Sequence, residues 1–277
     1  MQTLRLNSRG DSVVFLQELL NKVGYNLPGT SFFGTLTDTA VKDFQRKSGL
    51  VADGIVGVKT WTRLIQQSDF AKPEFSDKFL SEQDLIDFAA EYGLELALVK
   101  AVNEVESRGK GFLIDGRTKI LFEGHEFWRQ LKAIGLQPES LSNESNKDIL
   151  YPRWVRTFYS NGPGEYRRLE RAQQLIPSNP AVSTAALSSA SWGSFQIMGY
   201  HAKPLGYPSV EAFVDRMQTH EREHLAAFGK FIVVNRLLNH LKNKDWEKFA
   251  RGYNGPGYKQ NKYDEKLARA YKKYSEQ

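Results

Sequence analysis

A single break in the helical spacing of apolar residues divides this 277-residue sequence into two unequal parts. Over most of the chain, apolar residues recur every three or four positions, the spacing that places them on one face of an α-helix. Residues 68–80 lack that spacing and contain Pro73, which is typical of a linker. We therefore expect a first domain at 1–67, a linker at 68–80 and a second domain at 81–277.

The first part predicts a three-helix bundle. Its first helix ends at Gly24, Thr37 caps a second helix, and Thr60 begins a third. The second part predicts a mainly helical domain, with a helix that begins at Ser81, an apolar stretch that leads to Glu106, and later helices near 165–176, 210–239, 244–251 and 263–274. Residues 111–115 and 119–123 are expected to pair as a small β-hairpin around Gly116.

Composition excludes several classes of protein. The chain has no cysteine, so it holds no disulfide, thiol nucleophile or cysteine zinc site. The first residues form no apolar signal-peptide core, and no stretch approaches 18 uninterrupted apolar residues, so we expect synthesis in the cytoplasm without a signal peptide or transmembrane segment. The net charge is +6, but no nucleic-acid-binding signature accompanies it, so we expect no nucleic-acid partner.

Three short motifs in the second part carry polar groups suited to catalysis. The first is Glu104-Val105-Glu106-Ser107, where an apolar helix ends in carboxylates. The two glutamates point about 200° apart on a helix, so only one faces a cleft, and partial burial there would raise a pKa as a general acid requires. The others are the glycine-rich stretch 191–199, which contains Gln196, and the loop 251–257, which presents Tyr253 and Asn254.

Together and in this order, the three motifs resemble those shared by goose-type lysozymes and soluble lytic transglycosylases. The segments VESRGKGFLIDGRTKILFEGHEFW, GEYRRLERAQ and ALSSASWGSFQIMG resemble more closely the N-acetylmuramidase family of modular phage endolysins, over roughly residues 82–275. The resemblance implies a lysozyme-like helical fold and assigns the acid to Glu106 and a second glutamate to Glu123. It also implies that Ser107, Gln196, Tyr253 and Asn254 position the substrate. Gly193-Ser194-Phe195 departs from the residues that many relatives carry before the glutamine, which weakens any transfer of fine specificity.

Two carboxylates that flank a glycosidic bond are the usual arrangement of a glycoside hydrolase. Glu106 and Glu123 lie too far apart in sequence for one helix face, but a hairpin between them would bring both to one cleft. The alternative for Glu123 is a structural carboxylate paired with Arg117 or His125. With the family's chemistry, we expect hydrolysis of the β-1,4 bond between N-acetylmuramic acid and N-acetylglucosamine, without a cofactor or metal. A lytic transglycosylase, which cuts the same bond to a 1,6-anhydro product, and a non-catalytic wall-binding protein are the alternatives.

The first part resembles the helical peptidoglycan-binding domain family almost throughout. The matching residues are Leu16, Gln17, Leu20, Gly24, Phe33, Gly34, Thr37, Ala40, Val41, Phe44, Gln45, Gly49, Leu50, Asp53, Gly54, Val56, Gly57 and Thr60. Most of these residues determine the fold, so the contacts to the wall are expected among exposed residues near the turns, with Phe32, Arg46 and Asp53 as candidates. The resemblance as a whole implies a monomeric endolysin that stays in the host cytoplasm until release, acts on peptidoglycan in the periplasm and causes lysis.

Two further patterns compete with this interpretation or extend it. His220-Glu221-Arg222-Glu223-His224 fits the H-E-x-x-H pattern of zinc peptidases, but no third ligand follows at the expected spacing. Residues 263–274 form a basic amphipathic pattern, in which the apolar positions Leu267, Ala270, Tyr271 and Tyr274 alternate with Lys266, Arg269, Lys272 and Lys273. We favour a helix that closes the second domain over one that binds an anionic envelope surface.

Overall fold

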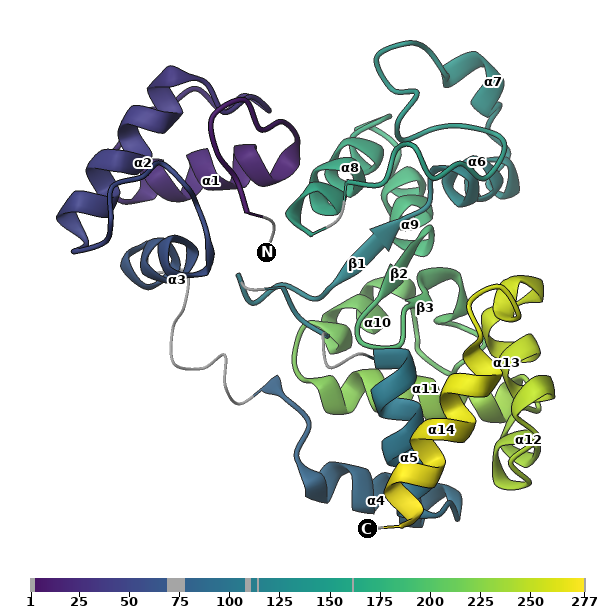
Figure 1. Ribbon diagram of the computed structural model, residues 1–277. Helices are drawn as coiled ribbons and strands as arrows, with labels where there is room; N and C mark the ends of the chain where they lie inside the picture. The colour runs from purple at the N-terminus through teal and green to yellow at the C-terminus, as the bar shows by residue number, and fades with distance from the viewer. Residues whose placement is uncertain (1–2, 69–77, 108–110, 114, 161, 277) are drawn as a thin grey trace.

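The computed structural model describes residues 3–68, 78–107, 111–113, 115–160 and 162–276. The described part of the chain is mainly helical and forms two bodies with separate hydrophobic cores (Figure 1). The first body is the expected three-helix bundle, α1 (Asp11–Lys22), α2 (Thr35–Lys47) and α3 (Val58–Gln67). Because neither core shares a residue with the other, each body buries its own apolar surface.

Two threonines of the bundle play a different part from the one expected. Neither Thr37 nor Thr60 caps a helix, because α2 and α3 begin earlier, after Gly34 and Gly57. Both threonines are buried and accept a hydrogen bond from a glutamine amide, Thr37 from Gln17 at 2.9 Å and Thr60 from Gln45 at 3.1 Å. The bundle thus uses the same buried glutamine–threonine contact twice, and satisfied polar groups of this kind fix how helices pack.

The second body contains the remaining helices. They are α4 (Glu82–Tyr92), α5 (Leu96–Val102), η2 (Asn103–Ser107), α6 (Gly124–Ala133), α7 (Pro138–Leu141), α8 (Pro163–Gln173), α9 (Pro180–Ser188), η3 (Gly199–His201), α10 (Val210–Met217), α11 (Glu221–Val234), α12 (Leu238–Lys242), α13 (Trp246–Asn254), η4 (Pro256–Tyr258) and α14 (Tyr263–Ser275). The start at Ser81 is confirmed, since Ser81 and Asp84 form a reciprocal capping box. The single helix expected over 210–239 is wrong. The chain breaks after Met217 and again near Arg236, whose φ is +59°.

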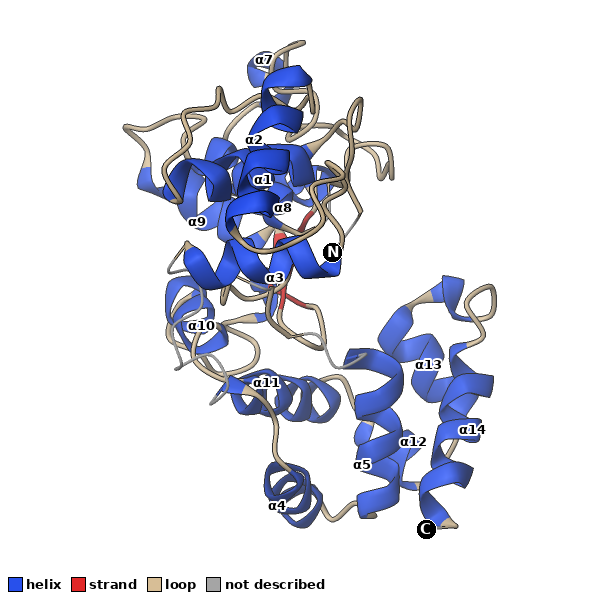
Figure 2. Ribbon diagram, turned by 60° about the vertical axis from the view of Figure 1, so that its left-hand side comes forward, coloured by secondary structure: helices blue, strands red, loops and turns tan. Residues whose placement is uncertain are grey.

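A small antiparallel sheet, red in Figure 2, lies between α8 and α9 on one side and α5 and α11 on the other (Figure 1). Its strands are β1 (Ile120–Phe122), β2 (Ala190–Trp192) and β3 (Ile197–Met198), in the order β1-β2-β3. The expected two-stranded hairpin between 111–115 and 119–123 is wrong. Around this turn the described residues form an isolated bridge between Phe112 and Thr118 and backbone hydrogen bonds such as the one from Lys119 to Gly111, and β1 pairs instead with β2. The hairpin of the domain is β2–β3, which pairs Ser191 with Met198.

Helix α8 also connects the two bodies. On its outer face, Arg167 forms an ion pair with Asp11 of α1 at 2.6 Å. Gly164 has no side chain where Asp11 approaches, and a Cβ added at Gly164 would lie 2.2 Å from an Asp11 carboxylate oxygen. The first turn of α8 therefore requires a glycine if α1 is to lie against it. Among the described residues, no helix is long and apolar enough to span a membrane.

Candidate active site

Glu106 lies in η2, a single π-helical turn that continues α5. Its Oε1 accepts a hydrogen bond of 3.2 Å from the side-chain amide of Asn254, at the end of α13. The neighbouring Tyr253 donates its hydroxyl to the carbonyl of Phe195 at 2.7 Å. Burial raises the pKa of Tyr253, and the nearby negative charge of Glu106 adds to this effect. The first and third motifs of the sequence therefore meet around Glu106, and π-helical turns occur often at functional sites.

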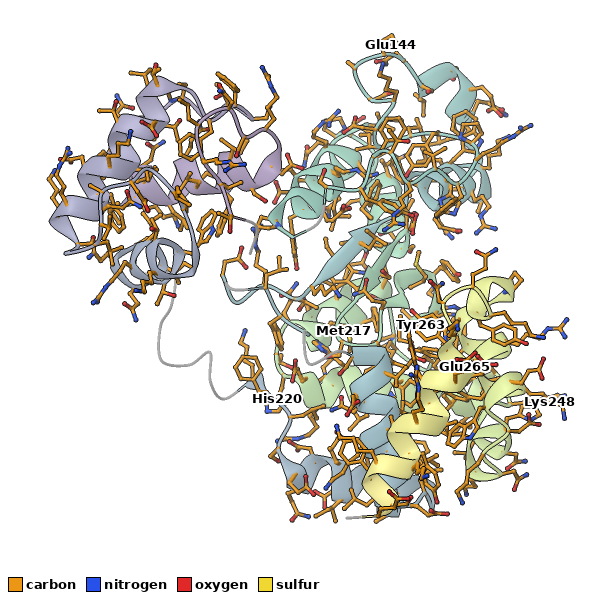
Figure 3. The ribbon with its side chains drawn as sticks, in the orientation of Figure 1. Glu144, Met217, His220, Lys248, Tyr263 and Glu265 are labelled. Carbon is orange, nitrogen blue, oxygen red and sulfur yellow. The ribbon has the colours of Figure 1, made fainter. Side chains whose placement is uncertain are left out.

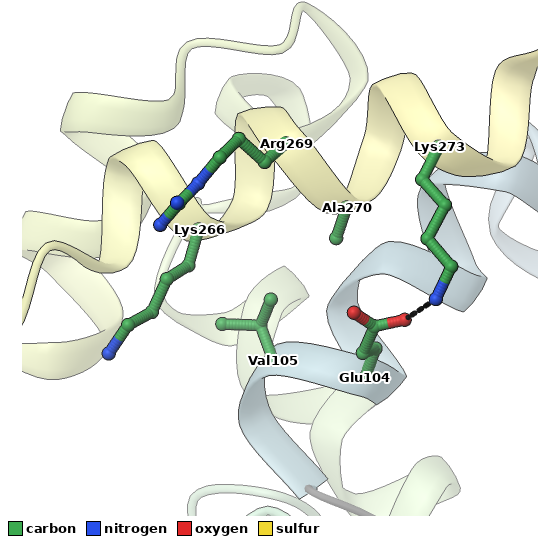
Figure 4. A pocket seen from close by; sticks show the side chains of 6 residues that line it. All are labelled: Glu104, Val105, Lys266, Arg269, Ala270 and Lys273. Carbon is green, nitrogen blue, oxygen red and sulfur yellow. Dashed lines mark hydrogen bonds and ion pairs between the residues drawn. The ribbon is translucent and has the colours of Figure 1, made fainter.

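Glu104 faces away from this contact. Its carboxylate pairs with Lys273 at 2.7 Å (Figure 4). It also accepts the Tyr274 hydroxyl at 2.6 Å, and both partners belong to α14. The hydrogen bond from Lys273 lowers the pKa of Glu104, followed by the one from Tyr274. A carboxylate held ionised by a lysine is a poor proton donor, so Glu106 is the better candidate for the acid of the two. Ser107 is buried, and its hydroxyl donates to the side-chain oxygen of Asn103 at 2.9 Å.

Glu123 follows β1 and precedes α6, and its side chain is 14% exposed. The Tyr159 hydroxyl lies 2.8 and 2.7 Å from its two carboxylate oxygens. His125 lies beside the same carboxylate, with Nδ1 at 3.3 Å from Oε2. Of the two structural partners expected for Glu123, His125 is present, whereas Arg117 pairs with Asp115 at 2.7 Å.

His125 bridges two carboxylates, because its Nε2 also lies 3.1 Å from Oε1 of Glu126. The contacts with Glu123 and then Glu126 raise the pKa of His125 to about 9, against a smaller opposing effect of burial. At neutral pH the imidazole is therefore a cation beside Glu123. Glu123 therefore lies between the hydroxyl of Tyr159 and the imidazolium of His125.

A buried ion pair on α8 holds the strand that precedes Glu123. Glu165 and Arg168 contact each other at 2.8 Å, and both are almost fully buried. Glu165 accepts the backbone N–H of Phe122 at 3.1 Å, and Arg168 donates to the Phe122 carbonyl at 2.9 Å. Sequence reasoning assigned no role to this pair, although a glutamate and an arginine three residues apart in GEYRRLERAQ were a signal that could have identified it.

Gln196 lies in the β2–β3 turn with a left-handed φ of +51°. Its Nε2 donates to the carbonyls of Gly193 at 2.8 Å and Lys119 at 3.3 Å, and its Oε1 accepts the Ser191 hydroxyl at 2.9 Å. These contacts tie the turn to the segment that enters β1. The amide expected to contact substrate therefore already has partners within the protein.

The wall-contact candidates of the first domain occupy different settings. Phe32 is half-buried and lies beneath the Arg9 guanidinium, 4.4 Å from its ring centroid. Asp53 accepts hydrogen bonds from Gln45 and from the Ile55 backbone, so it also stabilises its own turn. Arg46 is exposed and lies 3.7 Å from Asp43. The structure does not bring the three residues together through any contact among the described residues.

The H-E-x-x-H segment is used for packing. His220, labelled in Figure 3, precedes α11 and caps it by accepting the Arg222 N–H. The two histidines therefore do not share a helix face. His224 is buried. Its Nδ1 accepts the Ser194 N–H at 3.1 Å, and its Nε2 lies 2.7 Å from the Met217 carbonyl. Both imidazole nitrogens therefore have protein partners, and no cluster suited to a metal ion occurs among the described residues.

Glu221 of the same segment also has backbone partners. It accepts hydrogen bonds from the N–H of Leu80 at 3.1 Å and of Gly111 at 2.9 Å.

At the other end of the chain, α14 packs along α5 and buries Leu267 and Ala270, as expected of a helix that closes the domain. Lys266 and Arg269 line the groove of about 490 Å³ beside Glu104 and Val105 that Figure 4 shows.

Comparison with known proteins matches both domains. Residues 95–275 match the N-acetylmuramidase family and residues 9–64 match a putative peptidoglycan binding domain. The crystal structure of the Burkholderia AP3 phage endolysin is similar over 100% of both chains, with 42% sequence identity and a TM-score of 0.66. An uncharacterized protein in the bpoA1 3′ region of Kitasatospora aureofaciens is 45% identical over 67 residues, which are 24% of this chain and 57% of that protein. The chain thus spans little more than half the length of that curated relative.

Proposed function

Because the chain belongs to the N-acetylmuramidase family, we propose that it is a phage endolysin that hydrolyses peptidoglycan. The bond cleaved is the β-1,4 linkage between N-acetylmuramic acid and N-acetylglucosamine. Glu106 protonates the leaving oxygen, and Glu123 activates water or stabilises the oxocarbenium-like transition state. The domain that carries both residues is a glycoside hydrolase domain of the lysozyme type.

The observation that carries this proposal is that named partners orient both candidate carboxylates. Glu106 accepts a hydrogen bond from the side-chain amide of Asn254, and Glu123 lies beside the Tyr159 hydroxyl and the protonated imidazole of His125. An amide donates to either protonation state of a neighbouring carboxyl group, because the protonated form still accepts through its carbonyl oxygen. The Asn254 contact is therefore compatible with an acid at Glu106, and Glu123 supplies the second carboxylate that a glycoside hydrolase uses.

The test of the chemistry is mass spectrometry of the products from purified peptidoglycan. Hydrolysis adds water and leaves reducing-end sugars, whereas a lytic transglycosylase uses the sugar's own 6-hydroxyl and leaves 1,6-anhydro ends. Reducing ends are expected, since the charged environment of Glu123 supports a second acting carboxylate. Predominantly anhydro products would overturn the hydrolytic assignment while leaving Glu106 as the acid.

The first domain completes the proposal by binding the wall. It is a putative peptidoglycan binding domain, and its core is separate from that of the muramidase domain. Binding through one domain raises the local concentration of the other at its substrate. We place the protein in the host cytoplasm until release and its action on peptidoglycan in the periplasm, which leads to host lysis, by analogy with phage endolysins. Gln196, Tyr253, Asn254 and Ser107 remain proposed positioning residues.

A further inference from the structure

We propose that Glu221 is a positioning residue for the reaction. Its carboxylate fixes the start of β1 through Gly111, and it thereby fixes the place of Glu123, which follows the end of that strand. The proposal gives the segment His220–His224 a part in the reaction that requires no metal ligand. It rests on the proposed function, in which Glu123 is the second carboxylate of a glycoside hydrolase.

Glu221 is the first residue of α11, and it is only 6% exposed. Its Oε1 accepts the N–H of Gly111 at 2.9 Å, and its Oε2 accepts the N–H of Leu80 at 3.1 Å. Burial of a carboxylate costs free energy unless hydrogen bonds replace its water, and here each oxygen has a backbone donor. One buried side chain thus holds two segments that lie 110 and 141 positions before it in the chain.

Gly111 links Glu221 to the sheet. Its carbonyl accepts the N–H of Lys119, the residue before β1, at 2.8 Å. The carbonyl of Lys119 in turn accepts the N–H of Gly193 at 2.9 Å and the side-chain amide of Gln196 at 3.3 Å, both in the β2–β3 turn. Glu221 therefore reaches the start of β1 through the backbone of a single residue, and the same hydrogen bonds continue into the rest of the sheet.

β1 is a three-residue strand with a buried carboxylate near each end. At its last residue, Phe122, the backbone N–H is accepted by Glu165, and at its start Glu221 acts through Gly111. A strand this short forms few hydrogen bonds with its neighbour, so the contacts at both ends help to determine where it lies. Because Glu123 directly follows the strand, its position depends on both carboxylates.

The surroundings of Gly111 leave no space for a side chain. A Cβ added there would lie 2.4 Å from Ser194 Oγ, 2.6 Å from Glu221 Oε1 and 2.7 Å from His224 Nδ1. His224, one turn further along α11, also accepts the N–H of Ser194 at 3.1 Å. The first turn of α11 therefore contacts both the segment before β1 and the β2–β3 turn, and in such close packing a displaced group moves its neighbours.

The expected effect of Glu221 is on the rate of the bound complex. Glu221 is too buried to contact substrate, so its loss should leave KM unchanged. A shift of β1 would misplace Glu123, and a misplacement of about 1 Å caused by a distant mutation can lower a rate by about 100-fold. A positioning role therefore predicts a fall in kcat at constant KM.

The test compares Glu221→Ala with Glu223→Ala in the full chain, with soluble glycan strands as substrate. Glu221→Ala removes both acceptor oxygens, and we expect kcat to fall by about 10- to 100-fold while KM stays unchanged. Glu223 is the matched control: it lies on the same helix and pairs with Arg216 at 3.0 Å, so its change should leave both constants unchanged.

A double variant separates positioning from a general loss of folded protein. If Glu221 acts through Glu123, then Glu123→Ala already removes the group that is positioned, and adding Glu221→Ala should cause no further loss of the residual turnover. Independent effects would multiply instead, because their free energies add. Gly111→Ala disturbs the same contact from its other side, so it should give the same pattern and serves as the test if Glu221→Ala does not fold.

Three results would overturn the positioning role. They are an unchanged kcat for the folded variants of Glu221 and Gly111, a rise in KM at constant kcat, and losses that multiply in the double variant. Thermal unfolding at the parent temperature identifies the folded variants. Near-normal turnover of Glu123→Ala alone would contradict the proposed role of Glu123 together with this inference, whereas multiplied losses beside a strongly impaired Glu123→Ala contradict this inference only.

Discussion

The side-chain amide of Asn254 donates a hydrogen bond to Oε1 of Glu106 across 148 positions of the chain. This contact joins the π-helical turn after α5 to the end of α13. It holds one carboxylate oxygen and remains possible whether Glu106 is protonated or ionised. A general acid must occupy both states during a catalytic cycle, so Asn254 can orient Glu106 throughout.

Glu106→Gln should reduce wall lysis by at least about 100-fold, the order assigned to general acid catalysis, because an amide has no proton to deliver. Turbidity of purified walls measures the loss. Glu104→Gln is the matched control: it lies two residues away but pairs with Lys273, so activity should stay within a few-fold of the original. A folded Glu106→Gln protein with more than a tenth of the activity would remove Glu106 from the role.

Glu123→Ala should also abolish most activity, because it deletes the carboxylate held by Tyr159 and His125. Azide or formate is expected to restore part of the turnover by occupying the vacated space as a small anion. Kinetics on soluble glycan strands, with and without azide, provide the measurement. Near-normal turnover of the unrescued variant would make Glu123 a structural residue and support a single-acid mechanism.

The deprotonation of His125 should set the upper pH limit of stability and activity. Its pKa is raised to about 9 in the folded protein from the 6.5 of a free histidine, so its contribution to stability is fully present below pH 6.5 and is lost as the pH rises through 9. The unfolding temperature of the native protein should fall over that window more steeply than that of His125→Gln, and kcat/KM should decline with it. Parallel profiles for the two proteins from pH 6 to 10 would contradict a charged His125.

His224 should lower the stability of the fold at low pH, whereas His125 lowers it at high pH. Burial lowers its pKa to about 4, so the unfolded chain binds a proton that the folded protein excludes. Its neutral form supports the fold above pH 6.5, and stability falls as the pH drops towards 4, by on the order of 3 kcal/mol. Denaturant unfolding of the native protein and His224→Gln at pH 4 to 7 measures the difference.

Incubation with EDTA should leave activity unchanged, and inactivation by EDTA would support a metal site in the segment His220–His224.

Deletion of residues 1–70 should weaken retention on purified sacculi and leave cleavage of short soluble fragments largely unchanged. The muramidase core is complete without the bundle, so the truncated protein retains its own buried apolar surface. Tethering is the property that is lost. A pull-down that compares full-length and truncated proteins provides the measurement, and equal retention would contradict the assignment of the bundle to wall binding.

The sequence predicted the helices well because their apolar spacing is local information. Its errors arose where distant segments decide the outcome. Thr37 and Thr60 have the chemistry of caps, yet each is buried against a glutamine from another helix. The partner of β1 is a strand some seventy residues later, which no local pattern specifies. The Tyr159 partner of Glu123 and the Asn254 partner of Glu106 come from distant parts of the chain, so these contacts were visible only in three dimensions.

Because α8 contacts both domains, it matters when the wall-binding domain of one lysin is replaced by that of another. Its outer residue Arg167 pairs with Asp11 of the first domain, while Arg168, the next residue, donates a hydrogen bond to the carbonyl of Phe122, the last residue of β1 before Glu123. A mechanical load on the anchored bundle would therefore be transmitted to β1, the strand before the candidate residue Glu123, through one turn of α8. A grafted binding domain that lacks an acid at the position of Asp11, or carries a bulkier residue there, would not form the contact with Arg167 and Gly164 of α8. Such a domain would keep the enzyme near the wall without transmitting force to β1.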